Sequence, residues 1–145
     1  MMAPPGIRFE TCDDPPKDAA LVVDTGLGDF NDASAPLHEV RPLAVFARDE
    51  AGAVIGGAIG RTWGACAELQ QLWVVDSHRK RGIATRLVAD FEASASGRGS
   101  TFFYLTTWSF QAPDFYRRLG YEVAVRYEGY GHGLAMFHMK KGSPA

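Results

Sequence analysis

The fold of this chain is decided by residues 69–85, which read LQQLWVVDSHRKRGIAT. The first part of this stretch is rich in large apolar and β-branched side chains and therefore predicts a strand. The last part opens a helix, because Ile83, Leu87, Val88 and Phe91 recur at helical spacing. A short polar turn separates the two. The stretch predicts a strand, a basic turn and a helix in direct succession.

The basic turn has the composition of an anion-binding site. Arg79, Lys80 and Arg81 precede Gly82 at the predicted start of the helix. The first backbone N–H groups of a helix lack internal partners and carry partial positive charge. Glycine has no Cβ, so a phosphate can approach the main chain closely. Charge alone favours a solvated turn at the start of an ordinary helix, and the spacing of the residues favours the phosphate site.

Two motifs resemble the GNAT superfamily of N-acetyltransferases. Arg79-x-x-Gly82-x-Ala84, placed after a strand, resembles the acyl-CoA pyrophosphate loop of that family. Residues 112–121, APDFYRRLGY, resemble the later family helix, written A-x-x-F-Y-x-x-x-G-F/Y. Each motif occurs once and in the family's order, and the resemblance extends from about residue 7 to residue 141. Residues 108–116, with the Gly-His pair at 131–132, also resemble one uncharacterised bacterial branch of the family.

The sequence pattern and the resemblance together predict an α/β fold in a single domain spanning residues 1–145, with its core at about 7–141. The central sheet is expected to be mixed, with helices on both faces, and the resemblance implies that it splays between the fourth and fifth strands. A hairpin turn is expected at 49–52, and a loop or broken helix at 26–40. The predicted strands are 7–11, 41–48, 53–63, 65–75, 101–107, 121–127 and 134–140, and the predicted helices are 17–25, 80–95 and 112–119.

The resemblance also implies how acetyl-CoA is held. The backbone of residues 81–85 would bind the pyrophosphate, helped by the two preceding cationic side chains. The pantetheine arm would pair with the strand edge at 72–74, and a backbone N–H near Leu72 would stabilise the thioester oxygen. Ser109 stands where many members carry Asn, so its hydrogen bond to a pantetheine amide would be weaker. The implied cofactor-binding residues are Leu72, Trp73, Val74, Arg79, Lys80, Arg81, Gly82, Ile83, Ala84, Thr85 and Ser109.

Tyr116 is the candidate general acid. The family places a tyrosine here, beside the thioester sulfur, where it would protonate the thiolate leaving group. The alternative role is an aromatic side chain packed in the core, like its neighbour Phe115.

Glu68 is the candidate general base. It lies eleven residues before Arg79, the offset of the catalytic glutamate in the histone-acetylating branch of the superfamily. On an unbulged strand it would also share one face with Leu72 and Val74. Glu68 is equally expected as a solvent-facing strand residue. The alternative bases are Asp29, Asp32 and His132.

Composition narrows the class of protein. With 145 residues, 46% of them apolar, one core is expected, and a net charge of −2 argues against a nucleic-acid binder. The two cysteines and four histidines lack metal-ligand spacing, so no metal is expected. We expect no secretory leader and no membrane span, because the N-terminus lacks an apolar segment and no apolar run is long enough. A cytoplasmic protein is therefore expected.

The leading hypothesis is an enzyme that moves an acetyl group from acetyl-CoA to a primary amine of a small molecule, by direct attack in a ternary complex. Acetylation of a peptide or protein is the second hypothesis, and a non-catalytic acyl-CoA-binding module is the third. A homodimer is a family-level expectation. The chain is rich in aromatic residues, most of which should pack in the core. A few would wall the acceptor pocket and favour an apolar or aromatic amine.

Overall fold

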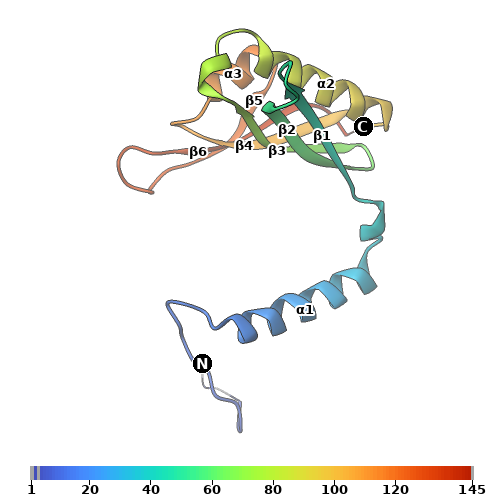
Figure 1. Ribbon diagram of the computed structural model, residues 1–145. Helices are drawn as coiled ribbons and strands as arrows, with labels where there is room; N and C mark the ends of the chain where they lie inside the picture. The colour runs from blue at the N-terminus through green and yellow to red at the C-terminus, as the bar shows by residue number, and fades with distance from the viewer. Residues whose placement is uncertain (1, 3, 145) are drawn as a thin grey trace. The chain divides into compact units, whose positions relative to one another are not determined.

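The computed structural model describes residues 2 and 4–144, and the chain divides into two compact units, Met1–Leu37 and His38–Ala145 (Figure 1). The second unit holds every strand of the described chain and both helices that carry buried residues. The expectation that residues 1–145 form one domain stays a prediction.

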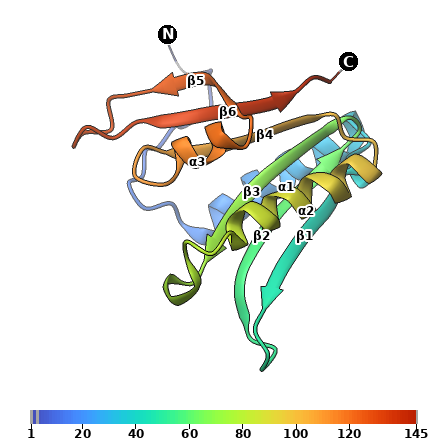
Figure 2. The same ribbon diagram turned by 90° about the horizontal axis from the view of Figure 1, so that it is seen from above.

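The second unit is built on one six-stranded sheet. Strands β3 and β4 are parallel and every other neighbouring pair is antiparallel, which confirms the predicted mixed sheet. The helices α2 (Ile83–Gly97) and α3 (Pro113–Arg118) lie over the same face of the sheet (Figures 1 and 2), so the two helices of this unit do not cover both faces as expected. The sheet order is β1-β2-β3-β4-β6-β5, with β1 Arg41–Arg48, β2 Val54–Trp63, β3 Cys66–Val74, β4 Phe102–Trp108, β5 Glu122–Tyr127 and β6 Met136–Gly142.

Helix α2 supplies the centre of the core. Its buried side chains, Leu87, Val88, Phe91 and Ala95, fall at helical spacing and face the first three strands. The helix begins three residues later than predicted, because residues 79–82 belong to the turn that follows the 3-10 segment η2 (Asp76–His78). The sequence therefore located the helix and its buried face, and it misplaced the first turn.

The sheet splits between β3 and β4. Their pairing runs from Cys66 opposite Phe102 to Leu69 opposite Leu105 and then ends, although both strands continue. The predicted splay is confirmed. Its partners are the third and fourth strands of the observed sheet, because the first predicted strand does not form.

Strand β3 carries a bulge just where it leaves β4. On β2, Ile59 pairs with Gln71 and Gly60 pairs with Leu69, so Gln70 is an extra residue without a direct partner. The backbones approach closely here, since a Cβ at Gly60 would lie 1.9 Å from the Glu68 carbonyl oxygen. Because side chains alternate along a strand, the extra residue exchanges the faces of everything that follows it.

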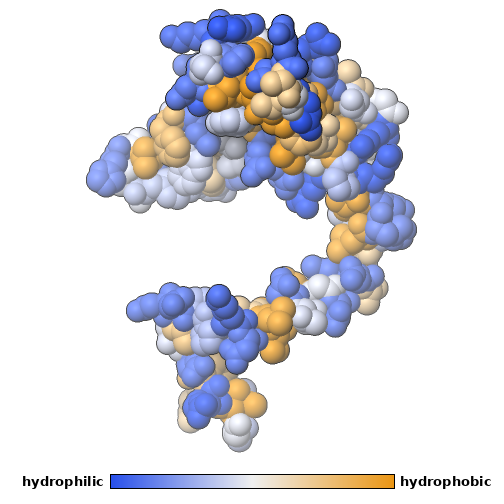
Figure 3. All heavy atoms as spheres, viewed as in Figure 1, coloured by the Kyte–Doolittle hydropathy of each residue, from blue (hydrophilic) through white to orange (hydrophobic). Residues whose placement is uncertain are grey.

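The first unit contains one helix, α1 (Lys17–Ser34), and none of its residues is buried. Its apolar side chains, including Leu21 and Phe30, are exposed, and some of them appear orange in Figure 3. The predicted strand at 7–11 is wrong, because among residues 2 and 4–144 these residues have no partner strand to complete their backbone hydrogen bonds. The predicted end of the helix near residue 25 is also wrong. Isolated glycines at 26 and 28 cost only about 1 kcal/mol each and do not end it.

Candidate active site

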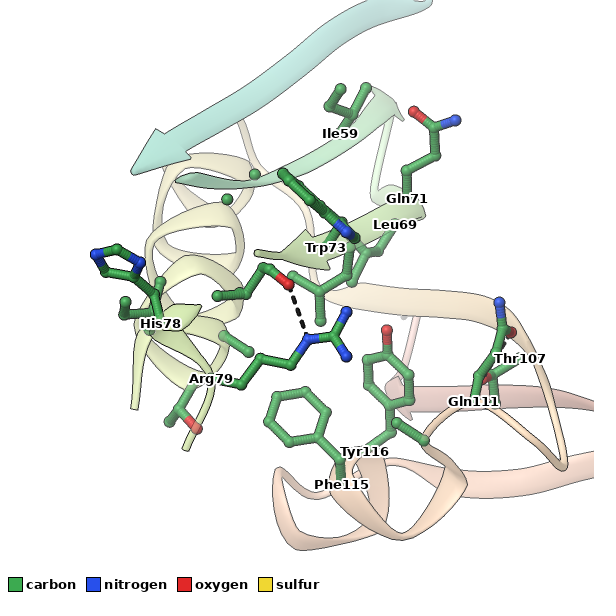
Figure 4. A pocket seen from close by; sticks show the side chains of 18 of the residues that line it. Ile59, Leu69, Gln71, Trp73, His78, Arg79, Thr107, Gln111, Phe115 and Tyr116 are labelled. Atoms are coloured by element: carbon green, nitrogen blue, oxygen red, sulfur yellow. Dashed lines mark hydrogen bonds between the residues drawn. The ribbon is translucent and has the colours of Figure 1, made fainter. Parts of the chain in front are cut away.

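A pocket of about 1160 Å³ occupies the split between β3 and β4. The end of β3, the turn into α2, the end of β4 and the helix α3 all contribute to its wall. In Figure 4 the side chain of Arg79 extends into this space from the turn before α2, and those of Phe115 and Tyr116 extend into it from α3. Residues that are far apart in the sequence therefore meet where the sheet opens, and the volume is large enough for a cofactor as well as a substrate.

The start of α2 forms one wall of the pocket. Gly82 has a φ angle of +79° and precedes the first helical residue, and no side chain caps this end. The first helical hydrogen bond runs from the Arg86 N–H to the Gly82 carbonyl at 3.1 Å. The N–H groups of residues 83–85 therefore precede the helical ladder, and no acidic residue lies in the first turn. This geometry suits an anion.

The free edge of β3 forms a second wall. The Val75 N–H donates to the Ile55 carbonyl at 2.8 Å and so points toward β2. Backbone groups alternate in direction along a strand, so the N–H groups of Val74 and Leu72 point into the split. The edge presents two backbone donors where β4 has departed.

Arg79 is held by the protein itself. Its Nε donates to the Val74 carbonyl at 2.9 Å, the hydrogen bond drawn in Figure 4, and its guanidinium pairs with the Asp76 carboxylate. Arg79 also lines the pocket, and its contact with a phosphate stays a prediction. Arg81 lines a second hollow of about 340 Å³ together with Arg86, and the expected role of its backbone stays a prediction. The other residues of the predicted set at 72–85 line the main pocket.

Tyr116 both packs in the core and reaches the pocket. It is 8% exposed, and its ring meets Phe115 and Tyr121 edge-on at centroid distances of 5.2 and 5.9 Å. Burial raises the pKa of the Tyr116 hydroxyl to about 12, because the phenolate would lose its hydration. The hydroxyl therefore stays protonated at neutral pH, as a hydrogen-bond donor must.

Glu68 lies on the other face of the sheet from the one predicted. The bulge at Gln70 gives Glu68 the same face as Gln71 and Trp73, opposite α2, rather than the face of Leu72 and Val74. The expectation of a shared face assumed an unbulged strand and is corrected here. The Glu68 Oε1 pairs with the Arg61 Nε at 3.0 Å, and the carboxylate is not part of the pocket lining.

Ser109 is used by the loop that precedes β6. Its Oγ accepts the Ala135 N–H at 3.0 Å, and its own N–H donates to the Ala135 carbonyl at 2.8 Å. Ser109 does not line the pocket, and its expected contact with pantetheine stays a prediction. Gln111, which the sequence did not single out, does line it. The Gln111 Oε1 accepts the Trp108 N–H at 2.8 Å, which leaves the NH₂ group of Gln111 as a donor.

The alternative bases are spread over the chain. Asp29 and Asp32 belong to α1, in the first unit, and His132 lies in the loop before β6 with a φ angle of +53°. Within residues 2 and 4–144, no group of His, Cys, Asp and Glu side chains could hold a metal ion. No helix of this part of the chain is long and apolar enough to cross a membrane.

A split mixed sheet, with an uncapped helix start beside it, defines the class of α/β proteins that bind an acyl-CoA. Residues 41–123 match the acetyltransferase (GNAT) domain, so the chain belongs to the GNAT acetyltransferases, enzymes that use acetyl-CoA. Blasticidin-S acetyltransferase of Streptomyces morookaense is 37% identical over 103 residues, covering 68% of this chain and 76% of the relative.

Solved structures share the fold. An acetyltransferase from Bacillus cereus superposes with a TM-score of 0.76 at 21% identity, over 92% of this chain and 98% of that one. An N-acetyltransferase from Thermoplasma acidophilum, solved with coenzyme A, has a TM-score of 0.57 at 20% identity, over 71% and 62% of the two chains. The predicted family, the fold, the enzyme class and the cofactor are thereby confirmed.

Proposed function

We propose that this acetyltransferase transfers the acetyl group of acetyl-CoA to a primary amine of a small molecule, by direct attack in a ternary complex. One observation carries the proposal: the uncapped start of α2, the free donors of β3 and the hydroxyl-bearing Tyr116 all border a single pocket. The name of the relative from Streptomyces morookaense, a blasticidin-S acetyltransferase, supports a small acceptor.

Acetyl-CoA would be anchored mainly by backbone groups. The N–H groups of residues 81–85 bind the pyrophosphate, and Lys80, which lines the pocket, adds a cation. The pantetheine arm lies along residues 72–74 as a short extra strand and pairs with the donors that point into the split. The NH₂ group of Gln111 would reach the arm from the β4 side and supply one more donor.

The Leu72 N–H would stabilise the charge that develops on the thioester oxygen. A fixed backbone donor needs no reorganisation during the reaction, which is why such donors are effective. Arg79 contributes indirectly, because its hydrogen bond to the Val74 carbonyl removes the nearest backbone acceptor from the edge. The negative charge then meets donors rather than a carbonyl oxygen.

Tyr116 would assist the departure of the sulfur. The amine nitrogen forms a bond to the acetyl carbon, the carbon–sulfur bond breaks, the amine gives up one proton to the base discussed below, and the leaving thiolate takes a proton from solvent. With a pKa of about 12, the tyrosine is a weaker acid than an ordinary thiol near ~8.5, so full transfer to the thiolate costs about 5 kcal/mol. Tyr116 therefore acts by donating a hydrogen bond to the sulfur while the thiol is protonated.

Glu68 would accept the amine proton through a water molecule. Its carboxylate lies on the sheet face opposite α2 and is held by Arg61, so an intervening water is needed to reach the pocket. The acceptor amine then approaches from that face, while the cofactor enters along the α2 side.

The test is amine-dependent release of free thiol from acetyl-CoA. The purified chain is incubated with a panel of small primary amines and with lysine-containing and N-terminal peptides. We expect turnover with small amines at higher kcat/KM than with any peptide. If only peptides are turned over, the enzyme is a protein acetyltransferase. If the rate of thiol release does not depend on the amine, acetyl transfer to nitrogen is excluded.

A further inference from the structure

Three aromatic side chains gather at the end of β4, and we call them the aromatic cluster: Trp108, Phe110 and Tyr130. The rings of Trp108 and Phe110 stack with their centroids 6.0 Å apart and their planes at 18°. The Tyr130 ring meets Trp108 edge-on at 4.7 Å. Both geometries are favourable arrangements for aromatic pairs.

The aromatic cluster is not part of the buried core. Phe110 is 66% exposed and Tyr130 is 45% exposed, so both leave much of their apolar surface in water. Exposed apolar patches on a folded protein commonly mark binding sites. The exposed surfaces of Phe110 and Tyr130 contribute little to the stability of the fold, and a bound ligand would cover them.

The cluster is held in place by its backbone. The Trp108 N–H donates to the Gln111 side chain, and the paired hydrogen bonds between Ser109 and Ala135 tie the turn after β4 to the residue before β6. The Tyr130 ring is carried by the β5–β6 loop, and the same pair of hydrogen bonds holds the end of that loop at Ala135. A site fixed in this way loses little freedom when a ligand binds.

The cluster continues the pocket described above. Phe110 and Gln111 both line that pocket, and Trp108 is the last residue of β4, the strand that leaves β3. The side chain of Trp108 shares a sheet face with that of Thr106, two residues earlier, which also lines the pocket. A substrate held near the β3 edge would therefore have the exposed rings beside it.

We infer that the acceptor is a primary amine that carries a planar aromatic ring, and that the ring stacks on the aromatic cluster. This inference rests on the proposed function and names the class of its acceptor. A flat ring fits because Phe110 and Trp108 already lie in a stacked arrangement that another plane can extend. The Tyr130 hydroxyl has one hydrogen bond in the structure, a weak one to the Met136 sulfur at 4.0 Å, so it can turn to a polar atom of that ring.

The experiment compares matched amines that differ in planarity. 2-Phenylethylamine and 2-cyclohexylethylamine have the same amine and nearly the same size, and the saturated ring is at least as hydrophobic. With saturating acetyl-CoA, we expect kcat/KM to be roughly 2- to 10-fold higher for the aromatic amine, the range given by one aromatic pair. Simple burial of apolar surface would give equal values or favour the cyclohexyl compound.

Variants assign the preference to the cluster. Phe110→Leu and Tyr130→Leu keep an apolar side chain at exposed positions, so folding should be unchanged, which circular dichroism checks. Each should lower the aromatic preference by raising the KM of the aromatic amine, with the KM of acetyl-CoA unchanged. Trp63→Leu is the matched control, because Trp63 is also exposed but lies outside the pocket lining.

The outcomes are distinct. Equal kcat/KM for the two ring types in the parent protein would overturn this inference and leave the proposed function standing. A preference that survives both leucine variants would overturn the assignment to the cluster. If none of the tested amines supports thiol release from acetyl-CoA, the proposed function is overturned, and this inference with it.

Discussion

Replacing Gly82 by alanine separates the anion site from the fold. Gly82 has a φ angle of +79°, and a Cβ built there meets no heavy atom within 4 Å. The folded protein therefore has room for the methyl group, and the cost comes from the left-handed backbone alone. That cost is roughly 1–2 kcal/mol for a residue with a Cβ.

Gly52 offers a matched control. It has a φ angle of +84° in the β1–β2 turn, and its Cβ would also meet nothing within 4 Å. Gly52→Ala and Gly82→Ala should therefore lose similar stability, about 4 °C in melting temperature for each kcal/mol in a domain of this size. The two variants differ only in their relation to the pocket, since Gly82 lines it and Gly52 does not.

Acetyl-CoA affinity should distinguish the two variants. A methyl group at Gly82 stands where a phosphate approaches the N–H groups of α2. Loss of one hydrogen bond to a charged group costs about 1.5–3 kcal/mol, so we expect affinity to fall roughly 10- to 100-fold for Gly82→Ala. Gly52→Ala should bind as the parent does, and Gly82→Val should bind more weakly than Gly82→Ala.

Isothermal titration calorimetry at two salt concentrations measures this directly. Binding to the parent should weaken as salt rises, because the phosphate contacts are partly exposed. If folded Gly82→Ala binds acetyl-CoA within twofold of Gly52→Ala, the phosphate does not sit at the start of α2 and the reasoning from the turn fails.

Three further predictions concern the remaining residues of the site. Tyr116→Phe should keep acetyl-CoA affinity and lower turnover about 10- to 1,000-fold. The pKa of the Tyr116 hydroxyl rises from 10 in the unfolded chain to about 12 in the folded protein. The parent should therefore lose about 2–3 kcal/mol of folding free energy as the pH rises through these two values, and Tyr116→Phe should lose less. Melting curves recorded at alkaline pH measure both losses. Glu68→Gln should lower turnover most at acidic to neutral pH, where free amine is scarce; an unchanged pH–rate profile would make Glu68 a structural residue and promote Asp29, Asp32 or His132. Gly60→Ala should lower the melting temperature far more than Gly52→Ala, because its Cβ would lie 1.9 Å from the Glu68 carbonyl oxygen; equal losses would show that β2 and β3 can separate freely.

The turn before α2 could be predicted from sequence because its determinants are local. A strand, a run of cations, a glycine and a helical repeat are all contiguous, and each acts within a few residues. The strand at 7–11 failed for the opposite reason, since a strand exists only if another strand completes its hydrogen bonds. Its five alternating residues carried no information about a partner.

The hydrogen-bond partners of the side chains in the site could not be predicted from the sequence either. The sequence does not show that the Ser109 Oγ accepts the Ala135 N–H, 26 residues later. It also does not show that the Arg79 Nε donates to the Val74 carbonyl. The cofactor contacts expected of both residues stay predictions. Hydrogen-bond partners set by tertiary structure decide such cases, and residue type alone does not. Gln111 could have been noticed in the sequence, because it is an amide directly before the second family motif.

The bulge at Gln70 sets the geometry of the site along β3. One extra residue exchanges both the direction of the backbone groups and the face of the side chains along the rest of β3. Without it, the N–H groups of Leu72 and Val74 would turn toward β2, and Trp73 would enter the core. The close approach of β2 to the Glu68 carbonyl at Gly60 permits the bulge to sit where β4 departs. The opening of the sheet and the donors that face into it therefore depend on the same irregularity, and a change that straightens β3 should remove both together.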